Sequence, residues 1–325
     1  MRRSTTTALL TALAALTALA LPAQAAAPTV ALQPDRLTRG ADVAVPHIED
    51  GVFVDGDRRV ELPGTVARVI GPSTDGWLVG TSQPNAVGET LRRDSRVVDV
   101  LPDGTVRTVL RRVAQEIVVA SEDGSTLLAV PAPGRTRAAV KAWSVADGSL
   151  VASRAFRGYP EVVTAEGRRA LVRTTTRTFW WNIATDTVRP VTKRLTGLAS
   201  TTHDLLATYT KDPYLGGCTE LVRLSDRSDV VWRSCRERVA AISPDGTQLL
   251  TFHILTDGLG PGEIHLRELD DTLLATWSTN WFGDWRWESP GVVLLDVNGK
   301  RTSATVRCTL GQCEDATDPV KVQAP

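Results

Sequence analysis

The sequence has no excess of either charge, since 37 lysine and arginine residues stand against 37 aspartate and glutamate residues. Residues 1–25 contain two of the arginines and no acid, so the chain without them has a formal charge of −2. A near-neutral chain with interspersed signs does not attract nucleic acid or anionic membranes electrostatically. The composition therefore argues against nucleic acid as a partner.

No apolar run is long enough to cross a bilayer. At the N-terminus, Arg2 and Arg3 precede an uncharged run at 8–21, and the small-residue signal "AQA" follows at 23–25. This order is typical of a secretory signal peptide and its cleavage site, not of a membrane anchor. The sequence predicts that residues 1–25 are removed. We expect a secreted monomer without membrane insertion, either free outside the cell or associated with the cell wall.

Familiar catalytic and cofactor motifs are also missing. The chain has no G-x-S-x-G elbow, no G-x-x-x-x-G-K-[ST] phosphate loop and no dense acidic loop for calcium. We therefore expect no cofactor and no metal ion, and the absence favours binding over catalysis. A Ser-His-Asp triad or a pair of catalytic carboxylates is recognised by geometry, so both stay open at this level.

Cysteine is scarce, and the four cysteines fall into two close pairs. Cys218 and Cys235 enclose two alternating strands around a polar turn, and Cys308 and Cys313 enclose the tight turn of "CTLGQC". In an exported chain this pattern predicts two disulfides, and the hairpins favour pairing within each pair. A four-cysteine zinc site is disfavoured because the sequence has no C-x2-C spacing.

Helical periodicity is almost absent beyond the signal peptide, and short apolar or alternating runs bounded by turn residues replace it. A strand, a turn and a second strand recur seven times, at 51–64, 97–110, 142–156, 179–192, 220–234, 264–278 and 308–313. Six of the turns contain an aspartate: Asp57 precedes Asp103 by 46 residues, and the next four aspartates follow at steps of 39 to 44. Such a period indicates a repeat architecture.

Six further units, each a turn followed by an apolar strand, lie between the hairpins, at 71–81, 120–130, 164–173, 201–209, 242–252 and 288–297. Four strands in a unit of about 42 residues make one blade of a β-propeller. The sequence therefore predicts an all-β chain in which residues 46–325 form a single β-propeller domain. Seven four-stranded blades are expected, and six are the alternative.

One of these units carries a resemblance to a known family. "ISPDGTQLLTF" (242–252) resembles the WD40-like repeat of TolB-type propellers, in which an "SPDG" turn joins the two inner strands, while "ASEDGSTLLAV" (120–130) and "ESPGVVLLDV" (288–297) match it in part. The resemblance implies a ring of blades that is often used as a binding platform, and no catalytic residues come with it. The Gly-His and Trp-Asp signatures of WD40 proteins do not recur.

Ring closure depends on the residues before the first hairpin. These residues supply only "ADVAVPHI" (41–48) toward a first pair of inner strands. We expect N-terminal strands to complete a blade built from the C-terminus, which is the usual closure of a propeller. Whether the N-terminal segment, residues 26–45, is ordered stays open.

The segment "WSTNWFGDWRWESP" (277–290) contains four of the nine tryptophans. Trp285 and Trp287 share a strand face because side chains alternate along a strand, whereas Trp281 and Phe282 are expected in the preceding loop. The indoles can fill the space between the last blade and its neighbour. They can also form a platform at a propeller mouth that holds sugar rings or an apolar peptide. In the second case Trp281, Phe282, Trp285 and Trp287 are the candidate ligand-binding residues.

One pair of tryptophans and one pair of histidines are further candidates for a site. In "TFWWN", Trp180 and Trp181 point to opposite faces, so one of them belongs to the core. His253 and His265 flank a hairpin and would lie opposite each other if it were symmetric about Leu259. Such a pair could ligate a metal with Asp257 or Glu263 as a third ligand. The same strand faces also carry Thr251 and Arg267, as a solvated face would, so a metal site there is disfavoured.

These observations predict a secreted, non-catalytic β-propeller that binds a cell-wall polysaccharide or an extracellular partner protein. The alternative is a propeller-fold glycan hydrolase or lyase with carboxylates in the central funnel. Two acids facing a funnel pocket, about 5–10 Å apart, would favour hydrolysis, and a sealed apolar axis would exclude it. A structural repeat that mediates assembly is a third possibility, and would expose an apolar patch across several blades.

Overall fold

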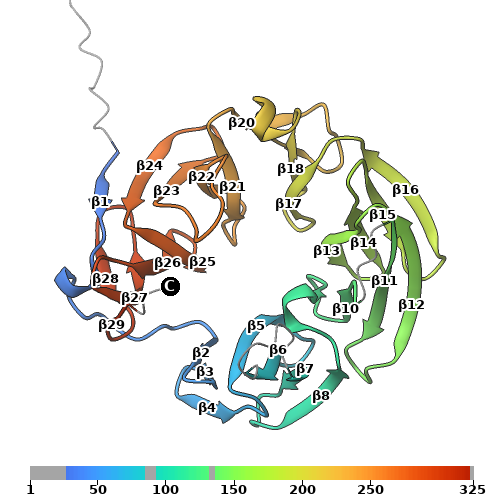
Figure 1. Cartoon of the computed structure of the whole chain (residues 1–325), viewed down its shortest axis with the longest axis horizontal. Helices are drawn as coiled ribbons and strands as arrows, with labels where there is room; N and C mark the ends of the chain where they lie inside the picture. Colours follow the sequence, from blue (N-terminus) through green and yellow to red (C-terminus); the bar gives the residue numbers. More distant parts are fainter. Residues whose placement is uncertain (1–26, 85–92, 132–135, 323–325) are drawn as a thin grey trace, which may run out of the picture.

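A computed structural model describes residues 27–84, 93–131 and 136–322. These residues form seven β-sheets arranged in a ring around an open centre (Figure 1). The only helical elements in this part of the chain are three single turns, η1 (Pro34–Arg36), η2 (Gln115–Ile117) and η3 (Pro213–Leu215). The fold is therefore an all-β, seven-bladed β-propeller, as the repeat predicted. The predicted signal peptide lies outside the described residues.

Blades 2, 3 and 4 are antiparallel sheets of four strands that follow one another along the chain. Blade 2 consists of β5 (Val66–Pro72), β6 (Trp77–Gln83), β7 (Arg93–Val100) and β8 (Val106–Arg111). Blade 3 consists of β9 (Val119–Ala120), β10 (Thr126–Ala129), β11 (Arg137–Ser144) and β12 (Leu150–Arg157). Blade 4 consists of β13 (Glu161–Glu166), β14 (Arg169–Arg173), β15 (Thr178–Asn182) and β16 (Thr187–Thr192).

Blades 5, 6 and 7 repeat this arrangement. Blade 5 consists of β17 (Thr196–Ser200), β18 (Leu205–Tyr209), β19 (Thr219–Arg223) and β20 (Val230–Ser234). Blade 6 consists of β21 (Glu237–Ile242), β22 (Gln248–His253), β23 (Glu263–Glu268) and β24 (Leu273–Ser278). Blade 7 consists of β25 (Trp281–Ser289), β26 (Val292–Asn298), β27 (Thr302–Cys308) and β28 (Cys313–Asp315), with β29 (Val320–Lys321) beside β27.

Blade 1 differs from the other six because its sheet has three strands within the described residues. They are β2 (His47–Glu49), β3 (Val52–Asp55) and β4 (Arg58–Glu61). In each of the other blades the first strand is innermost and the last two form the outer hairpin, as Figure 1 shows for blade 2. Because β3 and β4 form the predicted hairpin at 51–64, the strand that blade 1 lacks among the described residues is the innermost one.

Burial follows the position of a strand within its blade. The second strand β10 is buried along its whole length, whereas the outermost strand β12 is mostly exposed. The sequences of the second strands are therefore short apolar runs, because neighbouring blades cover both faces of each of these strands. The core consists of apolar layers between neighbouring blades, such as the cluster of Leu128, Val140, Val172 and Trp181 between blades 3 and 4.

Aspartates in the turns stabilise the hairpins by accepting hydrogen bonds from the amide two residues later. Asp103 accepts from Thr105 and Asp270 from Thr272, each at 2.9 Å. These bonds lower the pKa of both carboxyls below its usual value. The recurrent turn acids thus have a local structural role.

The ring closes in an unexpected way. Blade 7 is complete without the N-terminus, which corrects the expectation that N-terminal strands finish the C-terminal blade. Instead, β1 (Thr29–Ala31) pairs in parallel with β24 at the outer edge of blade 6. The chain then crosses the outside of blade 7 to reach blade 1 (Figure 1). We call residues 29–46 the strap.

Contacts along blade 7 hold the strap in place. Thr38 and Gly40 form backbone hydrogen bonds with Asp315, and Arg307 donates to the carbonyls of Ala41 and Asp42, all at 2.8–2.9 Å. Blade 6 is thereby linked to blade 1 across blade 7. Within the described residues the ring is therefore closed by a segment that adds a fifth strand to blade 6 and crosses blade 7, and not by a blade that both ends of the chain share.

Beneath the strap lies the carboxyl group of Asp315, which is only 2% exposed and has no hydrogen-bond partner at Oδ1. Desolvation raises the pKa of Asp315 to about 6, and the nearby Arg39 opposes the shift only in part. Because the folded pKa is above the unfolded value, folding is favoured at low pH and loses stability as the pH rises toward 6.

The Asp315→Asn variant is therefore expected to be more stable than the parent at pH 7.5, by about 1–3 kcal/mol. At pH 3.5 most of this difference should disappear, since the carboxyl is then neutral in the folded state and largely neutral in the unfolded chain. Urea unfolding at the two pH values measures this difference. Equal stability at pH 7.5 would mean that the carboxyl is solvated in the folded protein.

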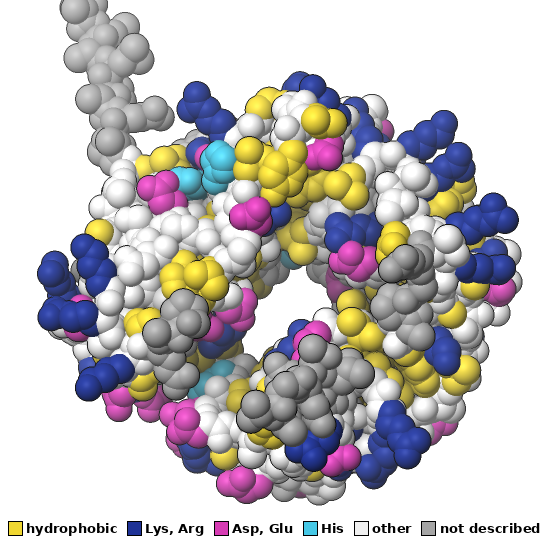
Figure 2. All heavy atoms as spheres, viewed as in Figure 1, with side chains coloured by type: hydrophobic (Ala, Val, Ile, Leu, Met, Phe, Trp, Pro, Cys, Tyr) yellow, Lys and Arg dark blue, Asp and Glu magenta, His cyan; other side chains and the backbone are white. Residues whose placement is uncertain are grey.

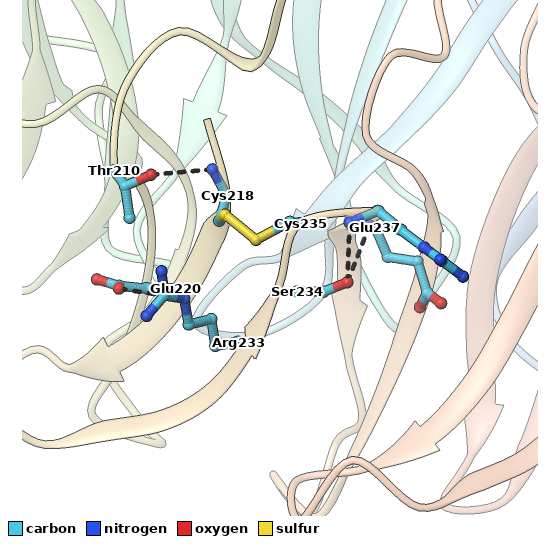
Figure 3. The surroundings of a disulfide bond; sticks show 8 residues. Thr210, Cys218, Glu220, Arg233, Ser234, Cys235 and Glu237 are labelled. Atoms are coloured by element: carbon cyan, nitrogen blue, oxygen red, sulfur yellow. Dashed lines mark hydrogen bonds and ion pairs between the residues drawn. A yellow bond between two sulfur atoms is a disulfide. The ribbon is translucent and has the colours of Figure 1, made fainter. Parts of the chain in front are cut away.

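Both predicted disulfides are present, and each connects two neighbouring strands. Cys308 and Cys313 are directly opposite each other in the β27–β28 pairing. The Cys218–Cys235 bond joins the residues just beyond the paired ends of β19 and β20 in blade 5, as Figure 3 shows. Each bond therefore closes one hairpin.

Candidate functional site

A cleft of about 1010 Å³ separates blade 7 from blade 1. One wall is formed by β25, β26 and β27, and the other by β2, β3 and the turn that follows β3. Figure 2 shows this hollow opening onto the central channel, which passes through the molecule. Its size exceeds that of the lateral pocket between blades 4 and 5, about 350 Å³. The cleft is where the regular packing of blades is interrupted.

The interruption follows from the missing innermost strand of blade 1. In the rest of the ring innermost strands are neighbours, as β13 is of β9 and β17. On its other side β5 has β2, the first strand of blade 1, as its neighbour, whereas between β2 and β25 the described chain supplies no strand. Asp284 on β25 and Arg68 on β5 border this part of the channel, and each influences the titration of the other.

Acidic side chains dominate the charge of the cleft. Its lining contains seven acids, Asp42, Glu49, Asp50, Asp57, Asp284, Asp296 and Asp318, but only two arginines, Arg39 and Arg59. Arg39 pairs with Asp42 and Asp318, and Arg59 pairs with Glu49 at 2.5 Å. The remaining four acids, Asp50, Asp57, Asp284 and Asp296, give the cleft an excess of negative charge.

Two of these acids share one guanidinium. Nη1 of Arg286 lies 4.0 Å from Oδ2 of Asp284 and 3.8 Å from Oδ1 of Asp296. Asp296 also accepts a hydrogen bond of 2.8 Å from the hydroxyl of Thr305. The two carboxylates therefore lie near each other at the axial end of the cleft.

The pKa of Asp284 is raised, mainly by desolvation, with the charge of Asp296 adding to the effect. A hydrogen bond from the amide of Trp285, together with Arg286 and Arg68, opposes this change. The side chain of Asp284 is nevertheless 65% exposed. Asp284 is thus an accessible carboxyl that gains a proton more readily than an ordinary aspartate.

The four aromatic residues predicted as ligand-binding have different environments. Trp281 is half-buried and lines the cleft, although it is the first residue of β25 and not part of a loop. Phe282 is fully buried in the core between blades 6 and 7. Only Trp281 of these two residues can contact a ligand in the cleft without a rearrangement.

Trp285 and Trp287 pack against that same core. The ring of Trp285 meets Phe252 of blade 6 edge-on at 5.1 Å, and its Nε1 donates to the carbonyl of Ala240. These contacts correspond to the first interpretation of the tryptophan-rich segment, in which indoles fill the space between the last blade and its neighbour. In the other tryptophan pair, Trp181 is fully buried and Trp180 is not, as the alternation predicted.

The predicted histidine pairing is wrong. His265 lies opposite Thr251, and His253 lies opposite Glu237 on the other side of its strand. The hairpin between β22 and β23 is not symmetric about Leu259, because residues 254–262 form an irregular loop. No group of three or more His, Cys, Asp or Glu residues in the described ranges is arranged to hold a metal ion.

Sequence reasoning did not identify Asp284, Asp296 or Arg286 as members of a site. One signal was available, because Asp284 lies within the tryptophan-rich segment 277–290, most of whose aromatic side chains pack into the core. An acid on an innermost strand faces the channel or must find a buried partner. The residues across the cleft, which come from blade 1, had no comparable signal.

Comparisons with known proteins support the fold of the chain and no specific function. No family model and no curated protein matches the chain. An uncharacterized protein of Listeria monocytogenes has a similar structure, with 15% identity over 79% of this chain and 84% of the other, and a TM-score of 0.51. A chain of the mitotic checkpoint complex is 12% identical over 87% and 89% of the two chains, with a TM-score of 0.51.

TolB from Acinetobacter baumannii is also among the structural neighbours, with 12% identity over 68% of this chain and 61% of its own, and a TM-score of 0.45. At these identities the neighbours show a shared fold and no more. Within the described residues, no helix is long and apolar enough to cross a membrane.

Proposed function

We propose that this β-propeller is an exported, non-catalytic binding scaffold that holds a cell-wall polysaccharide or a partner protein in the cleft between blades 7 and 1. The observation that carries the proposal is the cleft itself, where the half-buried indole of Trp281 stands among carboxylates and the amide of Asn298. An aromatic face with hydrogen-bonding groups around it suits ligands that combine an apolar surface with polar groups.

Two observations support export. The described part of the chain contains two disulfides and no free cysteine. Disulfides of this kind form and persist in oxidising compartments outside the cytosol. The arginine-flanked apolar N-terminus is the second observation, so we propose a secreted or wall-associated location. Sequencing the N-terminus of the protein recovered from culture medium would test cleavage after Ala25.

Trp281→Ala is expected to weaken binding to the ligand by about tenfold or more, since a central aromatic anchor carries a large share of the free energy of binding. Retention of the oxidised protein, residues 26–325, on insoluble cell wall and on a set of polysaccharides measures this effect. The matched control is Trp180→Ala, because Trp180 is another half-buried tryptophan and lies in blade 4, away from the cleft.

Retention of the parent and of Trp180→Ala, with loss for Trp281→Ala, would locate a wall ligand in the cleft. Equal retention of all three proteins would place wall binding elsewhere on the ring. If the parent itself is not retained, the polysaccharide is the wrong ligand and partner proteins become the subject of the search.

A glycan hydrolase is the second candidate, and the carboxylates of Asp284 and Asp296 favour it specifically. Hydrolysis needs one carboxyl that donates a proton and one that stays ionised, and the raised pKa of Asp284 fits the donor. Release of reducing sugars from purified cell walls would reveal such an activity. Activity that disappears in Asp284→Asn would replace the scaffold proposal.

A further inference from the structure

Blade 1 offers an unpaired strand edge next to the channel. Its first strand, β2, pairs only with β3, and no other backbone hydrogen bond involves residues 47–49 within the described chain. Every other blade carries one more strand at the corresponding position. A free edge beside an open cleft presents amide and carbonyl groups that an extended segment can bind.

The strap does not occupy this position. Its last part follows blade 7, where Val43 packs with Leu294 and Ala316, and the amide of Ala44 donates to Glu288 at 2.8 Å. The chain then enters β2 directly after Pro46. As far as residues 27–84, 93–131 and 136–322 are concerned, the place of the innermost strand, between β25 and β2, is therefore open to another segment.

The charge of the cleft indicates the chemistry of that segment. Asp50, Asp57, Asp284 and Asp296 have no strong ion-pair partner in the described chain, since the only pairs among them are the contacts of about 4 Å to Arg286. Side chains of opposite charge on a ligand would compensate these acids and speed its association. Anionic polymers such as phosphate-bearing glycans are disfavoured for the same reason.

We propose that the cleft binds an extended, basic peptide segment of a partner protein, which pairs with β2 and completes blade 1 as its fourth strand. This inference rests on the proposed function, because it uses the same cleft as the binding site. The innermost strands β13 and β21 have six residues each, so a segment of similar length fits the blade. Backbone pairing supplies affinity, and lysine or arginine side chains supply selectivity.

A fluorescent peptide built from an innermost strand of the chain itself tests the proposal. The probe has the sequence of residues 237–242, with lysine in place of Glu237 and one further lysine at each end. We expect this peptide to bind the oxidised full-length mature protein with micromolar affinity in low salt. Fluorescence anisotropy measures the affinity, and hydrogen exchange should show slower exchange of the β2 amides when the peptide is bound.

Three comparisons separate strand pairing from simple charge attraction. A peptide with proline in place of a central alanine cannot donate at that position, and it should bind at least tenfold more weakly. A peptide with glutamate in place of lysine should not bind. The protein variant Asp284→Asn with Asp296→Asn should bind the lysine peptide about tenfold more weakly, whereas Asp270→Asn, an exposed turn acid in blade 6, should bind it normally.

The strand-addition proposal would be overturned if the proline peptide bound as tightly as the original lysine peptide, or if the bound peptide did not slow hydrogen exchange of the β2 amides. So would the absence of binding at 1 mM peptide. If the peptide fails while wall retention depends on Trp281, the cleft is a polysaccharide site and only the peptide inference is lost. If both assays fail, the cleft is not a binding site and the proposed function fails with the inference.

Discussion

Arg307→Ala is expected to destabilise the folded protein by about 3–5 kcal/mol, the largest effect of any single substitution considered. The Arg307 side chain is 13% exposed, and its guanidinium pairs with Glu288, which is 9% exposed. It also donates to Glu314 and to the carbonyls of Ala41 and Asp42 in the strap. The alanine variant loses all these bonds and leaves Glu288 buried without its cation. Urea unfolding followed by tryptophan fluorescence measures the loss.

Two variants show whether burial is the cause. Arg301 also connects blade 7 to the strap, through an ion pair with Asp35 at 2.6 Å, but its side chain is 75% exposed. Arg301→Ala should therefore cost at most about 0.5 kcal/mol. Combining Arg307→Met with Glu288→Leu should recover part of the lost stability, since it leaves no buried charge unpaired. A similar cost for Arg301→Ala and Arg307→Ala would contradict this explanation.

Opening the Cys218–Cys235 disulfide by replacing both cysteines with alanine is expected to cost about 3 kcal/mol. The bond joins residues 17 positions apart, and in the chain-entropy model its main effect is to restrict the unfolded chain. Breaking Cys308–Cys313, whose loop spans 5 positions, should cost about 2 kcal/mol, because shorter loops restrict the unfolded chain less. Both values come from urea unfolding at one pH.

The location of the Cys218–Cys235 bond makes the effect local. Neighbouring groups include the hydrogen bond from Cys218 N to Thr210 and the ion pair between Glu220 and Arg233 (Figure 3). These contacts stay within blade 5, so the double alanine variant should keep an intact ring at room temperature. Unfolding of the whole protein under those conditions would show that the ring depends on this hairpin.

Sequence reasoning located the strands well because the propeller repeats one local pattern. Turn aspartates such as Asp103, Asp147 and Asp226 mark the outer hairpins, and all three accept hydrogen bonds from amides two residues later. Such turns are stabilised by neighbours in the sequence, so the residues alone reveal them. The disulfide pairing could be predicted for the same reason, since the two cysteines of each bond belong to one hairpin.

The cleft could not be predicted from the sequence, because it depends on which strand is absent from blade 1 and on residues that lie far apart in the sequence. Trp281 and His47 line the same space although more than 230 positions separate them in the sequence. Strand register also escaped prediction, as His253 and His265 show. An irregular loop between two strands shifts the pairing without leaving a periodic signal.

The strap also sets the order in which the protein can fold. It emerges early in synthesis, yet it binds Arg307 and Asp315 near the other end of the chain, with a separation of 266 positions between Ala41 and Arg307. During synthesis, the early segment cannot dock until the last blade has formed. Contacts between such distant residues are slow to form, so docking of the strap is expected to be a late folding step. Until that step, the edge of blade 6 that β1 covers stays available to other strands, which makes the newly synthesised chain most vulnerable to aggregation just before its ring closes.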